Sequence, residues 1–239
     1  MTLRAVAGRR ATPRDAPNPR WNPWANDQST LSLYRQRCRR EVAEMTCAAQ
    51  AAQILEGLVV PGERLLDAGC GGAYYYWSFL TRGIPIEYHG LDYTPEMIEL
   101  ARTELCPRTG LALERLTLGA IENLDREFDT ILCFNVLTNS PHYALPLERL
   151  LACACKRILF RESLGETLVV RYTPDPYLDE GKRDLRVYHN TYPLDEVVGF
   201  MQENGFRVTP IRDERSGDKV EMVVDIPHRW RILLGERVD

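Results

Sequence analysis

The sequence predicts an α/β fold, with a mostly parallel sheet and helices on both of its faces. From Leu65 onward, short apolar stretches alternate with amphipathic ones, which is typical of parallel strands joined by crossover helices. A glycine-rich turn follows the first of these stretches, and an antiparallel pair of strands is expected near the end of the chain. The 239 residues have ordinary globular composition and suit one domain of this kind.

The first elements are expected in a simple order along the chain. A helix capped by Asp27, Ser29 or Thr30 runs to about Leu58. The parallel strands are expected at Arg64–Ala68, Ile86–Leu91, Ala112–Leu118, Phe128–Phe134 and Arg157–Arg161. The helices between them are expected at Tyr75–Thr81, at Pro95–Leu105 with Thr94 as its cap, and at Tyr143–Cys155.

Residues 167–193 depart from this alternation. They contain two short strands, Leu168–Tyr172 and Arg186–Asn190, around a turn-rich stretch, and we predict a lid-like insertion there. The elements that follow are a helix and two strands that form a closing antiparallel hairpin, at Leu194–Glu203, Phe206–Arg212 and Val220–Ile226.

Residues 1–30 are predicted to be a flexible N-terminal arm, and residues 31–239 to be the folded domain. The arm is rich in arginine and proline and poor in aliphatic residues, which fits either a solvated tail or a contact with RNA. The net charge of the chain is −4, so nothing global attracts nucleic acid or an anionic membrane.

Composition also bears on the cellular location of the protein and on whether it contains disulfides or a metal site. No apolar run has the length of a membrane span or the character of a secretory signal, so a cytoplasmic protein is expected. The seven cysteines are odd in number, and no Cys or His cluster has zinc spacing. Neither a disulfide framework nor a metal site is therefore predicted.

The glycine-rich turn lies in Leu65–Gly72, between a predicted strand and a predicted helix, where backbone can approach a ligand. A dinucleotide fingerprint needs a third glycine where this chain has Tyr74. The string LDAGCGG instead resembles motif I of the class I S-adenosylmethionine-dependent methyltransferases. That resemblance implies a Rossmann-like sheet of seven strands with one antiparallel closing strand. It implies S-adenosylmethionine as the cofactor, held by Asp67, Gly69, Cys70 and Gly71.

The end of the second strand supports the resemblance. Asp92 lies 21 residues after Gly71, where a carboxylate can accept hydrogen bonds from both ribose hydroxyls. The run from Asp92 to Met97 is similar to the D-x-S/T-x-x-M segment of the family. Tyr93 is expected to cover the adenine face, and Met97 to contact the cofactor.

Two later loops complete the predicted cofactor site. The loop after the third strand has Ala120 where the family often has an acid, so Ala120 and Ile121 are expected to act through their backbone. The segment Phe128–Leu137 is similar to another family segment and places Asn135 and Val136 at the carboxyl end of the fourth strand, where ligands of open α/β sheets bind. Tyr34 of the N-terminal helix is also expected to contact the cofactor.

The resemblance implies methyl transfer to a nucleophile held in line with the methyl group. A hydroxyl acceptor benefits from a general base, and His142 and His189 are the predicted candidates. His89 lies inside a predicted strand and His228 near the end of the chain, so both are discounted. The tyrosines of residues 167–193 could enclose an organic acceptor.

Three functions remain open at this point. We expect a methyltransferase that acts on oxygen or nitrogen of a small-molecule acceptor, as a monomer or homodimer, without nucleic acid or membrane partners. One alternative is an RNA or protein methyltransferase that uses the arginine-rich arm. The other is a non-catalytic methyltransferase-like binding module, against which the intact Gly69, Gly71 and Asp92 argue.

Overall fold

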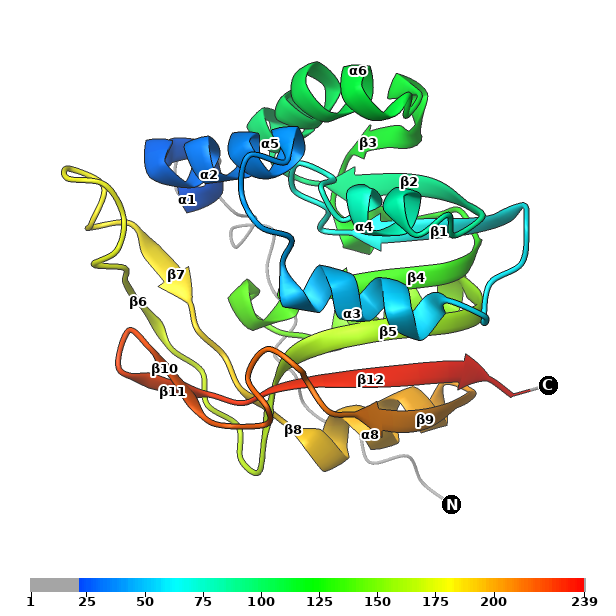
Figure 1. The fold of residues 1–239 in the computed structure, drawn as a ribbon. Helices are drawn as coiled ribbons and strands as arrows, with labels where there is room; N and C mark the ends of the chain where they lie inside the picture. Colours follow the sequence, from blue (N-terminus) through cyan, green and yellow to red (C-terminus); the bar gives the residue numbers. More distant parts are fainter. Residues whose placement is uncertain (1–21, 239) are drawn as a thin grey trace.

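The computed structural model describes residues 22–238, and Figure 1 shows a central sheet with helices on both faces. Seven strands follow one path through this sheet in the order β3-β2-β1-β4-β5-β12-β9, and the short β8 pairs with β5 beside it. The strands of the path are β1 Glu63–Ala68, β2 Ile86–Asp92, β3 Leu116–Leu118, β4 Phe128–Phe134, β5 Ala154–Gly165, β9 Phe206–Ile211 and β12 Trp230–Arg237; β8 is Tyr192–Pro193.

The parallel half of the sheet confirms the predicted α/β fold. Strands β1 to β5 pair in parallel, and β1 lies between β2 and β4. The third strand begins at Leu116 rather than Ala112, because Leu113–Arg115 forms a 3₁₀ turn, η4, directly before it. The fifth strand is longer than expected and continues to Gly165. The added part of the strand includes Glu162, whose contacts are described below.

Alternate side chains of the strands enter two separate cores. Leu65 belongs to the core under α3, α4 and α5, whereas Leu66 belongs to the core under α7 and α8. These helices are α3 Thr46–Leu55, α4 Tyr76–Thr81, α5 Pro95–Leu100, α7 Ala144–Cys153 and α8 Leu194–Glu203. Short helical segments complete the layers: the π-helix η3 Ala101–Leu105, α6 Cys106–Thr109, and the 3₁₀ turns η5 Ile121–Asn123 and η6 Leu137–Asn139. Within residues 22–238, no helix is long and apolar enough to cross a membrane.

The predicted hairpin between Phe206–Arg212 and Val220–Ile226 is wrong. Strand β9 pairs antiparallel with β12, which lies between β9 and β5 in the sheet. The part of the chain between β9 and β12 forms a separate antiparallel ribbon of two strands, β10 Glu221–Val223 and β11 Ile226–His228. The antiparallel strand thus lies one place inside the edge. Burial decides this arrangement, since Ile232 and Leu233 of β12 fill the two opposite cores.

The N-terminal helix predicted to reach Leu58 is also wrong. Helix α2, Gln28–Arg39, ends at Arg40, whose backbone is left-handed with φ 58°. The guanidinium of Arg40 lies 5.1 Å from the ring centroid of Trp77, and α3 starts afresh at Thr46. The helix is therefore interrupted at a residue that makes a tertiary contact, and the sequence has no Gly or Pro there to predict the interruption.

The boundary of the predicted arm falls inside folded structure. Residues 22–30 contain α1, Pro23–Asn26, and the start of α2. Asn22 is buried and donates to Thr94 Oγ1 over 2.9 Å, and Asp27 caps α2 by accepting from the backbone N–H of Thr30. These residues belong to the domain; residues 1–21 lie outside the described part of the chain.

Residues 167–193 form an antiparallel ribbon that projects from the sheet toward α1 and α2 (Figure 1). Its strands are β6 Tyr172–Pro174 and β7 Arg186–Tyr188, so the first begins later than predicted, preceded by a single bridge between Val169 and Thr191. The ribbon tip docks on α2, because the Asp179 carboxylate accepts from the backbone N–H groups of Gln28 and Ser29. The ribbon thus connects the end of β5 with the start of α2.

Candidate functional site

The glycine turn after β1 is a tight loop at the carboxyl edge of the sheet. The N–H groups of Gly69 and Cys70 both donate to the carbonyl of Leu91, at 2.7 and 3.0 Å, which ties the loop to β2. Gly69 has φ 80°, and a Cβ there would collide with Val136. A Cβ on Gly71 would lie 2.6 Å from Cε1 of Tyr34. The loop, the end of β4 and α2 therefore meet closely, and bulk at either glycine would separate them.

Asp92 ends β2 and fixes the same loop. One carboxylate oxygen accepts from the N–H of Gly71 and the other from the N–H of Thr94, both at 2.8 Å. The side chain is 8% exposed. Burial raises the pKa of Asp92 above its usual value, opposed by the hydrogen bonds from Thr94 and Gly71. The backbone of Tyr93 and the Thr94 side chain also contribute hydrogen bonds, so the carboxylate is fixed between the glycine turn and the start of the next helix.

A second buried carboxylate lies next to Asp92. Asp67 accepts a hydrogen bond from the Tyr88 hydroxyl over 2.6 Å. Burial raises the pKa of Asp67 to about 7, with a further contribution from the charge of Asp92, while the Tyr88 hydrogen bond lowers it. Two acids at the end of β1 and β2 make this edge a natural position for a positively charged ligand group.

The other predicted cofactor contacts divide into exposed and buried groups. Tyr93 is 46% exposed at the edge, where its ring is accessible to a ligand. Met97 and Cys70 are buried, and Cys70 Sγ lies 2.8 Å from the position that a Cβ on Gly90 would take. Both buried side chains pack the core, and their contact with a cofactor stays a prediction.

The loop after β3 reaches the same edge through its backbone. The N–H of Gly119 donates to the carbonyl of Asp92 over 2.9 Å. Ala120 follows and is half-buried before the turn η5, whose first residue, Ile121, is buried. This position suits the backbone role expected for Ala120 and Ile121.

The end of β4 is held by two charged residues that the sequence analysis did not identify as functional. Asn135 has φ 59°, and its side-chain oxygen accepts a hydrogen bond from Arg161. The buried Glu162 carboxylate accepts from the N–H groups of Val136, Leu137 and Thr138. Arg161 and Glu162 therefore fix the shape of the loop that presents Asn135 and Val136.

Arg161 is itself paired inside the protein. Its guanidinium donates to both oxygens of Asp213, at 2.6 and 3.1 Å, and neither side chain has exposed surface. The Arg161 Cζ lies 4.8 Å from the ring centroid of Trp230. The sequence signal was available: an arginine and a glutamate interrupt an otherwise apolar strand, and buried charges need partners.

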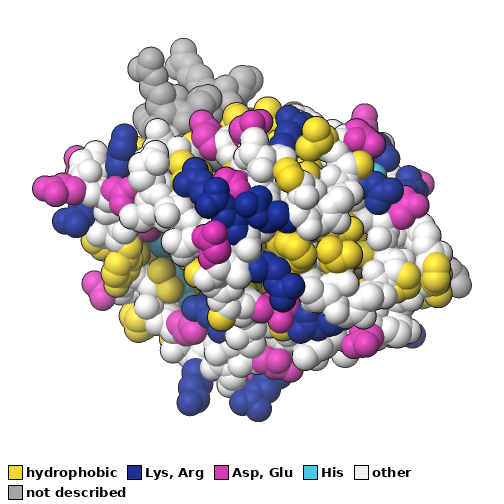
Figure 2. Space-filling view, turned by 45° about the horizontal axis from the view of Figure 1, so that its top comes forward, with side chains coloured by type: hydrophobic (Ala, Val, Ile, Leu, Met, Phe, Trp, Pro, Cys, Tyr) yellow, Lys and Arg dark blue, Asp and Glu magenta, His cyan; other side chains and the backbone are white. Residues whose placement is uncertain are grey.

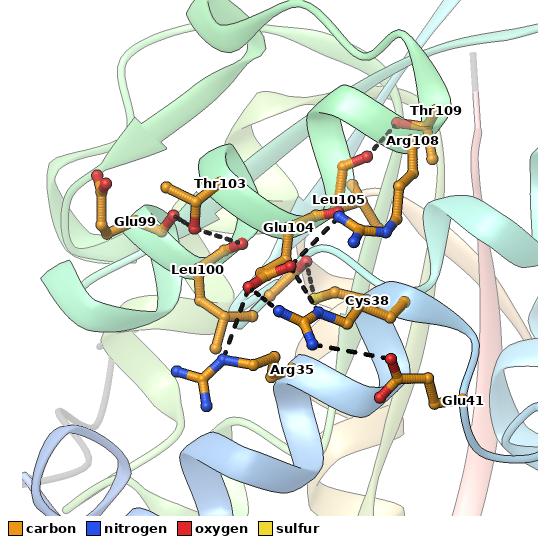
Figure 3. Close-up of polar contacts among 12 residues, drawn as sticks. Arg35, Cys38, Glu41, Glu99, Leu100, Thr103, Glu104, Leu105, Arg108 and Thr109 are labelled. Atoms are coloured by element: carbon orange, nitrogen blue, oxygen red, sulfur yellow. Dashed lines mark hydrogen bonds and ion pairs between the residues drawn. The ribbon is translucent and has the colours of Figure 1, made fainter.

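Tyr34 covers the glycine loop because α2 is anchored along its length. Figure 3 shows Glu104 of η3 with Arg35 and Arg108 beside it. Arg39 makes two hydrogen bonds of 2.7 Å to the same carboxylate. The anchor fixes α2 against α5 and η3, and the Tyr34 ring then packs on Gly71. The predicted Tyr34 position at the cofactor loop thus has a structural basis.

The two predicted bases, His142 and His189, lie close to the ends of η6 and β7. His142 lies between η6 and α7, and its Nδ1 is buried without a hydrogen-bond partner among the described residues. His189 follows β7, and burial lowers its pKa. The neighbouring Asn190 donates to the carbonyls of Thr138 and Ser140, which brings the ribbon base against the loop before His142.

The discounted His228 also belongs to this cluster. It ends β11, is 1% exposed, and its ring centroid lies 5.9 Å from that of His189. Its ring stacks on Trp230 with centroids 5.3 Å apart. Sequence position alone could not show this, because the strand β12 that brings Trp230 to the end of β5 was not predicted.

The face around α2 and α6 carries both signs of charge. Figure 2 shows basic side chains interleaved with acidic ones there. Several are paired, as in the Glu104 cluster and the pair of Arg82 with Glu44. On this face the described residues form no uniformly basic surface of the kind that binds nucleic acid.

Comparison with known proteins agrees with this geometry. Residues 66–156 match the sequence profile of a methyltransferase domain. A magnesium protoporphyrin IX methyltransferase from Synechocystis, solved with S-adenosylmethionine, matches with a TM-score of 0.58 and 16% identity, covering 94% of this chain and 99% of that one. No curated protein matches by sequence.

Other solved structures share the fold across most of the chain. A 1,6-didemethyltoxoflavin-N1-methyltransferase from Burkholderia thailandensis matches with a TM-score of 0.55 and 18% identity, covering 94% of this chain and 93% of that one. An S-adenosylmethionine-dependent methyltransferase from Clostridium acetobutylicum matches with a TM-score of 0.59 and 16% identity, covering 88% of this chain and 98% of that one. With its sheet order, its glycine turn and Asp92 at the end of β2, the chain has the fold of these solved methyltransferases, and residues 66–156 match a methyltransferase domain.

Proposed function

We propose that the protein transfers a methyl group from S-adenosylmethionine to an oxygen or nitrogen atom of a small organic acceptor. One observation carries the cofactor half of this proposal: the Asp92 carboxylate at the end of β2 accepts hydrogen bonds from the N–H groups of Gly71 and Thr94 and so lies directly at the glycine turn. A carboxylate at this place suits the hydroxyl groups of a ribose, whereas it would repel a phosphate.

The residues present fit the cofactor. Asp92 would accept the ribose hydroxyls, and Tyr93 would lie along the adenine. Asp67 would favour the positive charge of the ligand, because a cation nearby lowers the cost of its ionised form. S-adenosylmethionine supplies an electrophilic methyl group, so the protein needs no covalent intermediate. Its own task is to orient the acceptor and to exclude water.

The acceptor half rests on the ribbon of residues 167–193 and on the two histidines. The ribbon lies across the edge at which the parallel strands end, which is where ligands of such sheets bind. His189 or His142 would take the proton of an acceptor hydroxyl as the new bond forms. Solved neighbours include enzymes named for magnesium protoporphyrin IX, 1,6-didemethyltoxoflavin and a glycopeptide, which supports an organic acceptor and leaves its identity open.

Calorimetry with S-adenosylhomocysteine and with NAD tests the cofactor assignment. We expect S-adenosylhomocysteine to bind and NAD to show no measurable heat, because Tyr74 stands at the third position of a dinucleotide fingerprint. Binding of NAD together with absent binding of S-adenosylhomocysteine would reverse the assignment. Transfer of labelled methyl from S-adenosylmethionine to a panel of hydroxyl and amine compounds then tests the reaction.

A further inference from the structure

Three buried ring nitrogens gather beside the end of β5. His189 and His228 are 6% and 1% exposed, and their rings meet edge to face at an interplanar angle of 68°. Nε2 of His189 and both nitrogens of His228 have no hydrogen-bond partner within residues 22–238. Buried polar groups in native proteins are nearly always paired, so these nitrogens point to a missing polar ligand.

The two rings are brought together by a well-ordered set of backbone contacts. Leu164 of β5 donates its N–H to the carbonyl of Arg229 over 2.8 Å, which holds His228 at the strand end. On the other side, the Thr191 hydroxyl donates to the carbonyl of Pro227 over 3.1 Å and ties the ribbon base to β11. Three segments distant in sequence therefore build one site.

Direct contacts connect this site to the cofactor loop. His228 stacks on Trp230, and Trp230 lies under the guanidinium of Arg161. Arg161 binds the side chain of Asn135, whose neighbour Val136 packs on Gly69. The histidine pair thus lies at the end of the same edge, on the side away from Asp92.

The chemistry of the nitrogens selects the ligand. Burial lowers the pKa of His228 to about 4, with a further effect of His189, so the ring is neutral at physiological pH. A neutral imidazole offers one N–H donor and one acceptor nitrogen, and both are unpartnered here. A hydroxyl group can accept a hydrogen bond from the ring N–H and donate one to the other ring nitrogen, whereas a carboxylate only accepts and an ammonium only donates. Among the described residues, no group of three His, Cys, Asp or Glu side chains suits a metal ion.

We propose that His189 and His228 form the hydrogen-bonding wall of the acceptor subsite, and that the acceptor presents neutral hydroxyl groups to them, as a sugar or another polyol does. This inference rests on the proposed methyltransferase function. Trp230, which lies between His228 and Arg161 in this chain of contacts, supports the His228 ring by stacking on it.

Nitrogen NMR of the imidazoles tests the proposal, since the chain contains four histidines. The probes are glycerol, glycerate and serinol, which have similar size and are neutral, anionic and cationic. Each is titrated with and without S-adenosylhomocysteine, so that cofactor binding is read separately. We expect glycerol to shift the His189 and His228 nitrogens and to leave His89 unchanged, with smaller shifts for the charged probes. Larger shifts with glycerate or serinol, or none with any probe, would overturn the proposal.

The variant His228→Phe gives a second readout. Phenylalanine keeps the stack on Trp230 and removes both unpartnered nitrogens, so the ligand-free protein should melt at a higher temperature while the glycerol shift at His189 is lost. His89→Phe is the matched control, because His89 lies on β2 away from the site. S-adenosylhomocysteine should bind both variants like the parent. A lower melting temperature for His228→Phe than for His89→Phe would assign His228 a structural role and refute the proposal.

Discussion

Asp179 at the tip of the β6–β7 ribbon accepts a 2.7 Å hydrogen bond from the backbone N–H of Gln28, at the start of the helix that carries Tyr34. Its own N–H donates to Asp27 over 2.8 Å. The ribbon and the helix whose Tyr34 packs on the glycine loop are therefore joined directly.

Asp179→Ala should release the ribbon without unfolding the domain. The lost hydrogen bonds are exposed, and water can replace them, so the melting temperature should change little. Hydrogen exchange measured by mass spectrometry should rise at residues 172–188 and at the start of α2. Asp184→Ala, an exposed acid of the same ribbon, is the control. Unchanged exchange in Asp179→Ala would show that the ribbon is held by other contacts.

Asp92→Ala should remove most of the affinity for S-adenosylhomocysteine. Loss of charge-assisted hydrogen bonds to the ribose costs about 1.5–3 kcal/mol, measured as the dissociation constant by calorimetry. The substitution also frees the N–H groups of Gly71 and Thr94, so thermal unfolding must confirm a folded sample. Glu96→Ala, nearby and exposed, should bind normally. Normal affinity in Asp92→Ala would reduce Asp92 to a loop-fixing role.

Asp67→Asn should change the pH dependence of stability. The folded pKa of Asp67 is raised to about 7 by burial, so between about pH 4 and pH 7 the folded state holds a proton that the unfolded state has lost. This carboxyl therefore costs stability progressively as pH rises through that window. The variant should gain about 1–3 kcal/mol over the parent at pH 8 and little at pH 4, measured by urea unfolding. An equal difference at both pH values would contradict the assignment.

Asp213→Asn should destabilise the protein strongly. It leaves the Arg161 guanidinium buried without its counter-charge, and breaking such a pair costs about 3–5 kcal/mol. Glu236→Gln removes the partner of Arg207 in an exposed pair and should cost less than about 1 kcal/mol. Urea unfolding of both variants gives the comparison. A small effect in Asp213→Asn would mean that the two charges act independently.

His189→Ala should lower turnover while the affinity for S-adenosylhomocysteine stays nearly constant. Loss of a positioned base typically costs about 10²–10⁴ in rate. The measurement is turnover at saturating S-adenosylmethionine with the acceptor identified by the labelling panel. If only His142→Ala shows the loss, the base is His142. Full turnover in both variants indicates an acceptor that needs no base, such as a neutral amine.

The residues predicted to hold the cofactor could be named from the sequence because they are local, and the structure places them at one edge of the sheet; their contact with the cofactor stays a prediction. Asp67 to Gly71 is one continuous turn, and Asp92 follows it at a spacing that a β–α–β unit fixes. Strand β4 was predicted with its observed bounds, since an uninterrupted apolar run lies between polar segments.

The acceptor half could not be predicted because its residues meet only through the sheet. Trp230 lies opposite Ser163 in the β12–β5 pairing, and Arg161 forms an ion pair with Asp213, which follows the end of β9. In both pairs the partners lie far apart in the sequence, so a local sequence pattern cannot predict that they meet. The break at Arg40 is of the same kind, since a cation–π contact with Trp77 accompanies it.

The insertion of β12 between β5 and β9 constrains the order in which the sheet can assemble. β9 contacts the sheet only through β12, so it joins β5 together with β12 or after it, although β9 comes earlier in the chain. Until β12 has been made, β5 and β9 lack the strand that lies between them. Open strand edges are places where chains associate wrongly, so the last strand of the chain closes an edge that is otherwise exposed.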